Sequence, residues 1–233
     1  NDSLPFYIRV PPNTWHGLRA VGDQPCIIKE TIAGPYDSST LKWASFAPSE
    51  ADGSATGFDW YDKLAQFCDS QSILPPEDEV FEKVTDSVFR SNRQITTVSL
   101  EQLNPIIKAA QVSTLKRARL CCHSGSEEKL QEMFIALAPG VDIEESMHLR
   151  KDESLTVVSG TGSYLFPNED GSLRYKTQLS PISGDHSVNS RIYTRINRYV
   201  PHKIIVDSST LLIHEATTGP FDRADTEYRI SGV

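Results

Sequence analysis

From about residue 117 onward, apolar and polar residues alternate over short stretches that turn residues separate. Alternation with a period of two is typical of half-buried β-strands. The candidate strands are Arg117–His123, Gln131–Ala138, Glu153–Ser159, Ser163–Phe166, Leu173–Leu179, Arg191–Ile196, Lys203–Val206 and Leu211–Ala216. The run Pro167–Gly171 predicts a hairpin between two of them. Short strands without intervening helices favour a sandwich, a jelly roll or a barrel.

The first half of the chain has a different pattern. Leu4–Val10 and Pro25–Ile32 are apolar-rich and predict short β segments. Ala47–Gly57 is polar, lacks apolar periodicity and predicts a loop. Across Phe58–Val88 apolar residues recur at helical spacing, in two pieces that Pro75 and Pro76 divide. We therefore expect a helical connector between two β regions.

The connector continues beyond residue 88. Ile95–Val98 predicts a short strand, and a helix is expected to begin at Ser99, because Gln102 follows at the spacing of a capping box. Alternatively, Asn104 caps the helix with Pro105 at its first position. We expect three parts in the chain: a β segment over residues 1–57, a helical connector over 58–115 and a β-barrel over 116–233.

Composition narrows the classes of partner. With 23 Lys+Arg against 31 Asp+Glu the net charge is −8, which argues against a nucleic-acid partner. No apolar run approaches the roughly 18–20 residues that span a bilayer, so we expect no membrane partner either. The four cysteines are too sparse for a disulfide scaffold, which favours a cytoplasmic location. The chain starts at Asn1 rather than Met, so a signal peptide cannot be judged from this end.

One stretch of the predicted barrel carries a specific spacing. It resembles the first motif of the cupin superfamily, G-x5-H-x-H-x(3,4)-E-x6-G, with Ser146 where the family has its first His. The matching residues are Gly140, His148, Glu153 and Gly160. His202 stands where the second motif places a single His, although Asn197 and Tyr199 replace the family's Pro and Gly before it. The resemblance implies an all-β fold, the cupin double-stranded β-helix or jelly roll.

The same resemblance implies a metal site. His148, Glu153 and His202 would form a 2-His-1-carboxylate set suited to a divalent transition metal such as Fe, Mn, Ni or Zn. Residues two apart on a strand share a face, so Ser146 points the same way as His148. If the preceding segment is extended, Glu144 also faces inward and could supply a carboxylate. The alternative is a degenerate cupin whose pocket has lost its metal.

Several further residues are candidates for supporting roles. His123 and Glu132 precede the motif and could hydrogen-bond to the metal-bound imidazoles, which usually donate their second N–H to a neighbouring acceptor. Tyr199 or Tyr193, near His202, could act as an acid. His214 and Glu215 are expected to be structural, and His186 to be solvated. These assignments rest on position in the sequence.

Flanking segments narrow the resemblance. Over residues 85–230, segments such as Arg117–Arg119, Lys151–Ser154 and His214–Phe221 are similar to cupin-fold metalloproteins of the WbuC family, which are associated with bacterial surface-polysaccharide clusters. Residues 1–60 are similar to the C-terminal half of a dTDP-4-dehydrorhamnose 3,5-epimerase-like cupin. His16 would be that barrel's second-motif His and could line a pocket.

Only half of this second barrel is in the sequence. Residues 1–46 are too few to close a barrel, and open strand edges need cover. We therefore expect residues 4–33 to add to a sheet of the C-terminal barrel or to a partner subunit, in a homodimer.

Two functions are consistent with these observations. One is a metal-dependent enzyme that isomerises or epimerises a sugar or sugar nucleotide in surface-polysaccharide metabolism. The other is a non-catalytic module that binds a small polar ligand such as a carbohydrate in a degenerate site. Ser146 in place of His favours the second, and the family context favours the first.

Overall fold

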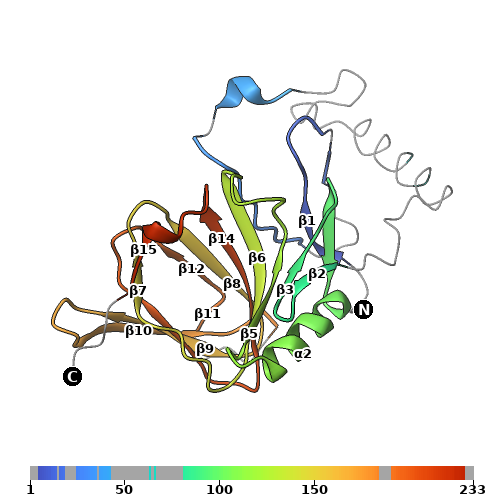
Figure 1. The fold of residues 1–233 in the computed structure, drawn as a ribbon. Helices are drawn as coiled ribbons and strands as arrows, with labels where there is room; N and C mark the ends of the chain where they lie inside the picture. The colour runs from blue at the N-terminus through green and yellow to red at the C-terminus, as the bar shows by residue number, and fades with distance from the viewer. Residues whose placement is uncertain are drawn as a thin grey trace.

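The computed structural model describes residues 5–14, 16–18, 25–35, 37–42, 63, 66, 81–183 and 190–228. Strands dominate these residues and form an all-β jelly roll, as the sequence predicts (Figure 1). Of the helices that the structure describes, none has the length and apolar character needed to cross a membrane.

The smaller side of the jelly roll is a four-stranded sheet with the order β11-β10-β9-β13. Its strands are β9 (Gly162–Pro167), β10 (Leu173–Leu179), β11 (Ser190–Arg191) and β13 (Lys203–Val206). β9 and β10 form the hairpin that the Pro-Asn-Glu-Asp-Gly turn predicts. β10 and β11 run parallel and pair only at Gln178 and Leu179.

The larger side is a seven-stranded sheet with the order β12-β8-β14-β6-β5-β3-β2. Its strands are β2 (Glu82–Thr85), β3 (Val88–Arg90), β5 (Arg117–Cys121), β6 (Leu130–Leu137), β8 (Glu153–Ser159), β12 (Tyr193–Ile196) and β14 (Leu211–Thr218). β14 lies between β6 and β8 and pairs antiparallel with both. It is therefore an interior strand of the sheet, paired along both of its edges.

The predicted strands of the second half are confirmed, with one subdivision. Glu153–Ser159, Leu173–Leu179 and Lys203–Val206 match β8, β10 and β13 to the residue. The predicted strand Arg191–Ile196 divides into β11 and β12, which belong to different sheets. The chain passes from one sheet to the other between β11 and β12. Where it does so depends on which strands each segment pairs with, and the alternation of apolar and polar residues does not show this. β7 (Ser146–His148) is the short strand that the shared direction of Ser146 and His148 requires, and it pairs with β15 (Thr226–Tyr228), a strand that was not predicted.

The seven-stranded sheet carries a hydrophobic core on each face. Residues directly opposite in an antiparallel pair share a face, and Thr217 lies opposite Glu153 while Ile213 lies opposite Val157. This face looks into the barrel, where the core contains Leu137, Leu155, Val157, Tyr164, Leu179, Ile196, Ile204, Leu211 and Ile213. On the outer face, Phe134 and Leu212 pack in a second core with residues of β4 (Thr96–Ser99) and α2 (Asn104–Val112). Figure 1 shows α2 beside this sheet.

The prediction of a helical connector over residues 58–115 is partly wrong. Residues 82–88, the end of the first predicted helical region, lie in the hairpin β2–β3, and β3 adds to the sheet by pairing parallel with β5. The apolar spacing of Phe81, Val84 and Val88 fits a helix, but an open edge of β5 offers backbone partners that a lone helix lacks. In the rest of that region the structure describes Lys63 and Gln66, which are helical, and Phe81, which is not.

The second helix of the connector is confirmed. The backbone N–H of Ser99 donates to Gln102 Oε1 at 2.8 Å, and the N–H of Gln102 donates to Ser99 Oγ at 3.3 Å. This is the reciprocal capping box that the sequence predicts. A 3-10 turn η3 (Glu101–Leu103) follows, and α2 then begins at Asn104 with Pro105 in its first turn. The predicted short strand before it is β4.

The N-terminal region supplies one strand of the two that were predicted. β1 (Pro5–Arg9) pairs antiparallel with β4 in a two-stranded sheet, next to the outer face of the barrel (Figure 1). Residues 25–32 contain no strand, and Ile27 and Ile28 are exposed. The predicted loop over residues 47–57 and the domain boundary at residue 57 lie outside the described residues.

Candidate metal centre

Three side chains from distant strands meet inside the barrel. His148 ends β7, Glu153 begins β8, and His202 precedes β13. Ser146 and His202 exchange two backbone hydrogen bonds of 3.0 Å, and the N–H of Tyr199 donates to the carbonyl of His148 at 2.7 Å. The segment before β13 is thereby held alongside β7, which places both imidazoles over the first residue of β8.

The geometry of this trio suits a cation. His148 Nε2 lies 3.0 Å from Glu153 Oε2, and His202 Nε2 lies 3.1 Å from Glu153 Oε1. One ligand atom from each of these residues lies within 4.8 Å of the others. Glu153 and His202 are each 7% exposed. Two imidazole nitrogens and one carboxylate in this arrangement match the donor set of divalent transition metals.

Hydrogen bonds on the far sides of the rings orient the imidazoles. His202 Nδ1 lies 2.9 Å from the carbonyl of Val200, which can only accept, so Nδ1 carries a proton. Nε2 then faces Glu153 with either a lone pair for a metal or a second proton. His148 Nδ1 lies 3.2 Å from Thr226 Oγ1 on β15. Metal-bound histidines usually donate their second N–H to a carbonyl in this way, so the site fits a metal.

The charges of the trio are coupled. Burial opposes ionisation of Glu153, but hydrogen bonds from His148 and His202 outweigh burial and hold the pKa of this carboxyl well below its usual range. Burial would also lower the pKa of His202, yet the hydrogen bond and charge of Glu153 raise it. A proton on His202 and a metal ion would therefore compete for the same position between the imidazole and the carboxylate.

Two further residues of the barrel interior extend the site. Tyr164 on β9 is 4% exposed, and its ring centroid lies 5.9 Å from that of His202. Burial and the charges of Glu153 and Glu215 raise the pKa of Tyr164. Burial and the charge of Glu153 raise the pKa of Glu215, on β14, to about 7. These two residues add protonatable groups to the interior.

Sequence reasoning missed the roles of both residues. Tyr164 was within a predicted strand but carried no motif, and Glu215 was expected to be structural. Strand alternation shows that His214 and Glu215 face opposite sides of the sheet, but it does not show which side is the barrel interior. The pairing of Thr217 with Glu153 decides this, since Glu215 shares the face of Thr217.

Glu144 does not join the trio. It is exposed and precedes β7 in a segment without strand pairing, so the extended conformation that would turn it inward is not formed. Ser146 lies on β7 next to His202, as its register predicts. The trio thus keeps three strong ligands, and position 146 supplies at most a hydroxyl.

Glu132 lies on the outer face of the sheet, and neither it nor His123 has a hydrogen bond or ion pair with the trio among the described residues. Glu132 pairs with Ala216, one residue from Thr217, and so points away from Glu153. Its carboxylate accepts hydrogen bonds from Tyr7 Oη at 3.2 Å and Arg9 Nη1 at 3.0 Å. His123 Nδ1 lies 2.9 Å from the backbone carbonyl of Glu132. The prediction that these residues support metal-bound imidazoles is therefore wrong, because Glu132 points to the opposite face of the sheet and the ring of His123 is held by the backbone of β6.

The remaining candidates lie away from the trio's ligand atoms. Tyr199 has a left-handed backbone, φ 64°, and is 63% exposed. Tyr193 is on β12, where Lys29 Nζ lies 5.3 Å from its ring centroid. His16 is exposed, and its Nδ1 lies 2.9 Å from the carbonyl of Thr14. His186 lies outside the described residues.

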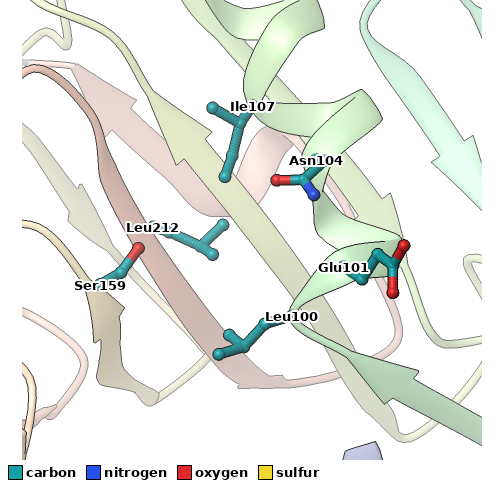
Figure 2. Close-up of a pocket in the computed structure, with 6 residues that line it drawn as sticks. All are labelled: Leu100, Glu101, Asn104, Ile107, Ser159 and Leu212. Carbon is teal, nitrogen blue, oxygen red and sulfur yellow. The ribbon is translucent and has the colours of Figure 1, made fainter. Parts of the chain in front are cut away.

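A shallow pocket of about 400 Å³ lies outside the barrel, between α2 and the seven-stranded sheet. Figure 2 shows its apolar floor, Leu100, Ile107 and Leu212, with Glu101, Asn104 and Ser159 at the rim. Its described lining shares no residue with the trio and includes one titratable side chain, Glu101. The metal centre is therefore the stronger candidate for the functional site.

Part of the chain matches a known family. A family model described as "Domain of unknown function (DUF6016)" matches residues 98–179, from within β4 to the end of β10. A search of curated proteins finds no match.

Among solved structures, the chain is similar to a protein from Shewanella oneidensis at 14% identity and a TM-score of 0.38, over 46% of this chain and 66% of that one. It is similar to a putative sugar phosphate isomerase from Acidithiobacillus ferrooxidans at 20% identity and a TM-score of 0.32, over 43% and 56%. It is similar to oxalate decarboxylase from Bacillus subtilis at 18% identity and a TM-score of 0.35, over 44% of this chain and 24% of that one. The chain covers less than two thirds of each, and these likenesses carry no conclusion about function.

Proposed function

We propose that the protein is a cupin-type metal protein that binds a divalent transition metal through His148, Glu153 and His202. The convergence of two imidazoles on one buried carboxylate, at 3.0 and 3.1 Å, carries this proposal. The hydrogen bond from His202 Nδ1 to Val200 supports it, because it leaves Nε2 free to bind a metal.

The ligand that we propose is a sugar or sugar nucleotide. A bound metal would polarise a carbonyl or hydroxyl oxygen of such a ligand. Tyr164 and Glu215 face the same interior, so they could hold or accept a proton there. The resemblance to WbuC-family and epimerase-like cupins supports sugar isomerisation or epimerisation, in surface-polysaccharide metabolism, as the reaction.

A second candidate is a binding module without catalysis. Ser146 favours it. The cupin motif has a histidine at this position, whereas the serine hydroxyl is only a weak neutral ligand. Incubation of the metal-loaded protein with UDP-glucose and dTDP-glucose separates the two. Product formation in NMR spectra supports the enzyme, whereas a raised melting temperature without product supports the binding module.

Elemental analysis of the purified protein tests metal binding directly. We expect a stoichiometric first-row transition metal in the untreated protein and its loss in His148→Ala. A matched control is His16→Gln, on an exposed histidine that contacts Thr14, which should retain the metal. Ser146→His should tighten binding about ten-fold or more by adding an imidazole ligand.

The opposite result is informative. Metal-free protein as purified, with an ion bound only after Ser146→His, would show that the site has lost its metal. The metal proposal would then be wrong, and the barrel would be a ligand-binding cavity.

A further inference from the structure

Two arginines share one face of the seven-stranded sheet, where β5 and β3 extend it beyond β6 (Figure 1). Arg90 of β3 pairs with Cys121 of β5, and Arg119 lies two residues before Cys121 on the same strand. Residues that pair across strands, or that lie two apart on one strand, point to the same face. The residues between them point the other way and pack in the outer core, namely Phe89, Ala118 and Leu120. Both arginines and Cys121 therefore lie on the inner face, which also carries Glu215.

Both guanidinium groups lie near the thiol of Cys121. Burial raises the pKa of this thiol, and the charges of Arg119 and Arg90 oppose the rise. Burial also raises the pKa of Glu215, and the charge of Arg119 is among those that oppose it. Cys121 pairs with Met133, and Met133 pairs with Glu215, so two strand spacings, roughly 10 Å, separate Cys121 from Glu215 across the sheet. The arginine pair therefore adjoins the barrel interior at Glu215.

Neither arginine has a counter-charge in the described part of the chain. Arg90 is half-buried, and its Nε is buried without a hydrogen-bond partner, while Arg119 is exposed. The acid opposite Arg90 is Glu82 of β2, which is exposed and accepts a hydrogen bond from Asn92 Nδ2 at 2.8 Å rather than from the guanidinium. Arg117, at the start of β5, adds a third positive charge to the same face. Neighbouring cations repel each other, and a half-buried one is poorly solvated, so a shared anion would relieve both effects.

Phosphate fits this pair of cations better than a carboxylate does. A guanidinium presents its N–H donors in a planar fork, which binds phosphate through two parallel hydrogen bonds. A phosphate monoester carries a charge of about −1.5 to −2 at pH 7 and three acceptor oxygens, so it can engage both forks and balance both charges. A single carboxylate has one negative charge and would leave one of the two cations unbalanced.

We propose that Arg90 and Arg119 bind the phosphate group of a phosphorylated sugar. The sugar part extends along the inner face of the sheet toward Glu215, whose carboxyl can hydrogen-bond to sugar hydroxyls. The phosphate subsite requires no metal. The sugar part rests on the proposed function, which assigns the same class of ligand to the barrel.

Calorimetric titration of the full chain at low salt tests this subsite. The probes are glucose 6-phosphate, UDP-glucose, inorganic phosphate and glucose. We expect a phosphorylated sugar to bind more tightly than inorganic phosphate, and glucose not to bind measurably. The first two probes distinguish a phosphate monoester from the diphosphate of a nucleotide sugar. Higher salt should weaken binding in the wild type.

Substitutions of the arginines make the test specific. The double variant Arg90→Gln/Arg119→Gln should lose at least about ten-fold in affinity for inorganic phosphate and for the phosphorylated sugar, because each charge-assisted hydrogen bond is strong. Arg119→Gln alone changes an exposed side chain, so it tests the subsite even if loss of the half-buried Arg90 impairs folding, and it should lose several-fold. The control Arg174→Gln removes an exposed charge from β10, in the other sheet, and should change no affinity. Melting curves verify folding.

A variant of Glu215 tests the position of the sugar. Glu215→Gln should weaken binding of the phosphorylated sugar several-fold without weakening that of inorganic phosphate. An equal loss for inorganic phosphate would contradict a contact between Glu215 and the sugar.

Other outcomes would overturn the proposal. No phosphate binding at millimolar concentration, or equal losses in Arg174→Gln and the double variant, would contradict the phosphate subsite. Equal affinities for inorganic phosphate and both phosphorylated sugars would contradict the sugar part.

A repeat of the titration on chelated protein and on His202→Gln separates this subsite from the metal centre. Loss of phosphate binding in both would assign the phosphate to the metal and contradict the arginine subsite. Unchanged phosphate affinity in both would support the subsite even if elemental analysis had contradicted the metal centre, so the two failures are distinguishable.

Discussion

At the scale of single residues, Glu153 shows how a buried charge is accommodated. An isolated carboxylate in a barrel interior would be strongly destabilising. Each oxygen of Glu153 meets one imidazole, and this arrangement keeps the carboxyl ionised despite its burial. The same arrangement makes the site sensitive to a proton or a metal at His202.

The trio predicts a pH dependence of the metal-free protein. Glu153 raises the pKa of His202 in the folded protein. Protonated His202 therefore stabilises the fold fully below about pH 6.5, the pKa of a histidine in the unfolded chain, and this stabilisation is lost as the pH rises through the folded pKa. The pKa of Glu215 is raised to about 7, so the folded protein also loses stability as the pH rises and this carboxyl ionises. We expect chelated protein to lose thermal stability between about pH 6 and pH 8, and His202→Gln to lose less. Equal pH profiles for the two proteins would contradict this expectation.

His214 predicts the opposite dependence in acid. Burial, with the charge of Lys29, lowers its pKa to about 3, so the unfolded chain takes up a proton that the folded chain refuses. The contribution of His214 to stability should therefore fall below about pH 6.5, by up to about 1.4 kcal/mol per pH unit, while protonation of Glu215 acts in the opposite direction. His214→Phe should reduce that slope in urea titrations between about pH 4 and pH 6. The raised pKa of Glu132, due to burial, opposes part of the effect. An unchanged slope would show that other groups dominate acid unfolding.

At the scale of elements, the helix that follows β4 depends on its capping box. Ser99→Ala removes the acceptor for the N–H of Gln102 and should lower the free energy of unfolding by about 1 kcal/mol. The double variant Ser99→Ala/Gln102→Ala should lose less free energy of unfolding than the two single variants lose together, because each side chain bonds to the other residue's backbone. Ser209→Ala, at an exposed serine outside any helix, should change stability little. Chemical denaturation measures all three, and strict additivity would contradict a reciprocal cap.

At the scale of the whole molecule, one sheet holds two layers together. The outer face of the seven-stranded sheet is covered by α2, β4 and β1, and the ring of Tyr7 lies 5.1 Å from that of Phe134. Arg9 forms ion pairs with Glu128 and Glu132 of the barrel. The N-terminal strand therefore covers apolar surface and neutralises a buried carboxylate of the same chain.

Deleting residues 1–46 should consequently destabilise the protein. The deletion exposes part of the outer core and leaves Glu132 without Tyr7 and Arg9, so we expect a melting temperature lower by about 5 °C or more and increased binding of a hydrophobic dye. An unchanged melting temperature would contradict this role. We also propose a homodimer, which sedimentation of the full chain and of the truncated chain tests.

The sequence by itself determined the strands of the second half, the hairpin at residues 167–171, the capping box at Ser99 and the three metal-ligand candidates. The strands, the hairpin and the capping box follow from spacing along the chain, because their interactions are between residues close in sequence or follow the period of a strand. The three ligand candidates follow from the resemblance to the two cupin motifs, which lie about fifty residues apart.

Only the tertiary structure decided which side of a strand faces the barrel and where short segments pair. Residues 82–90 have helical spacing but join β5 as strands, because a free sheet edge satisfies their backbone groups. Glu132 and Glu215 both lie on strands, yet one faces the outer layer and the other the barrel interior. An alternating sequence looks the same whichever face of the strand points into the barrel. Contacts between strands far apart in sequence decide which face does so, and the arrangement that buries the most apolar surface is favoured.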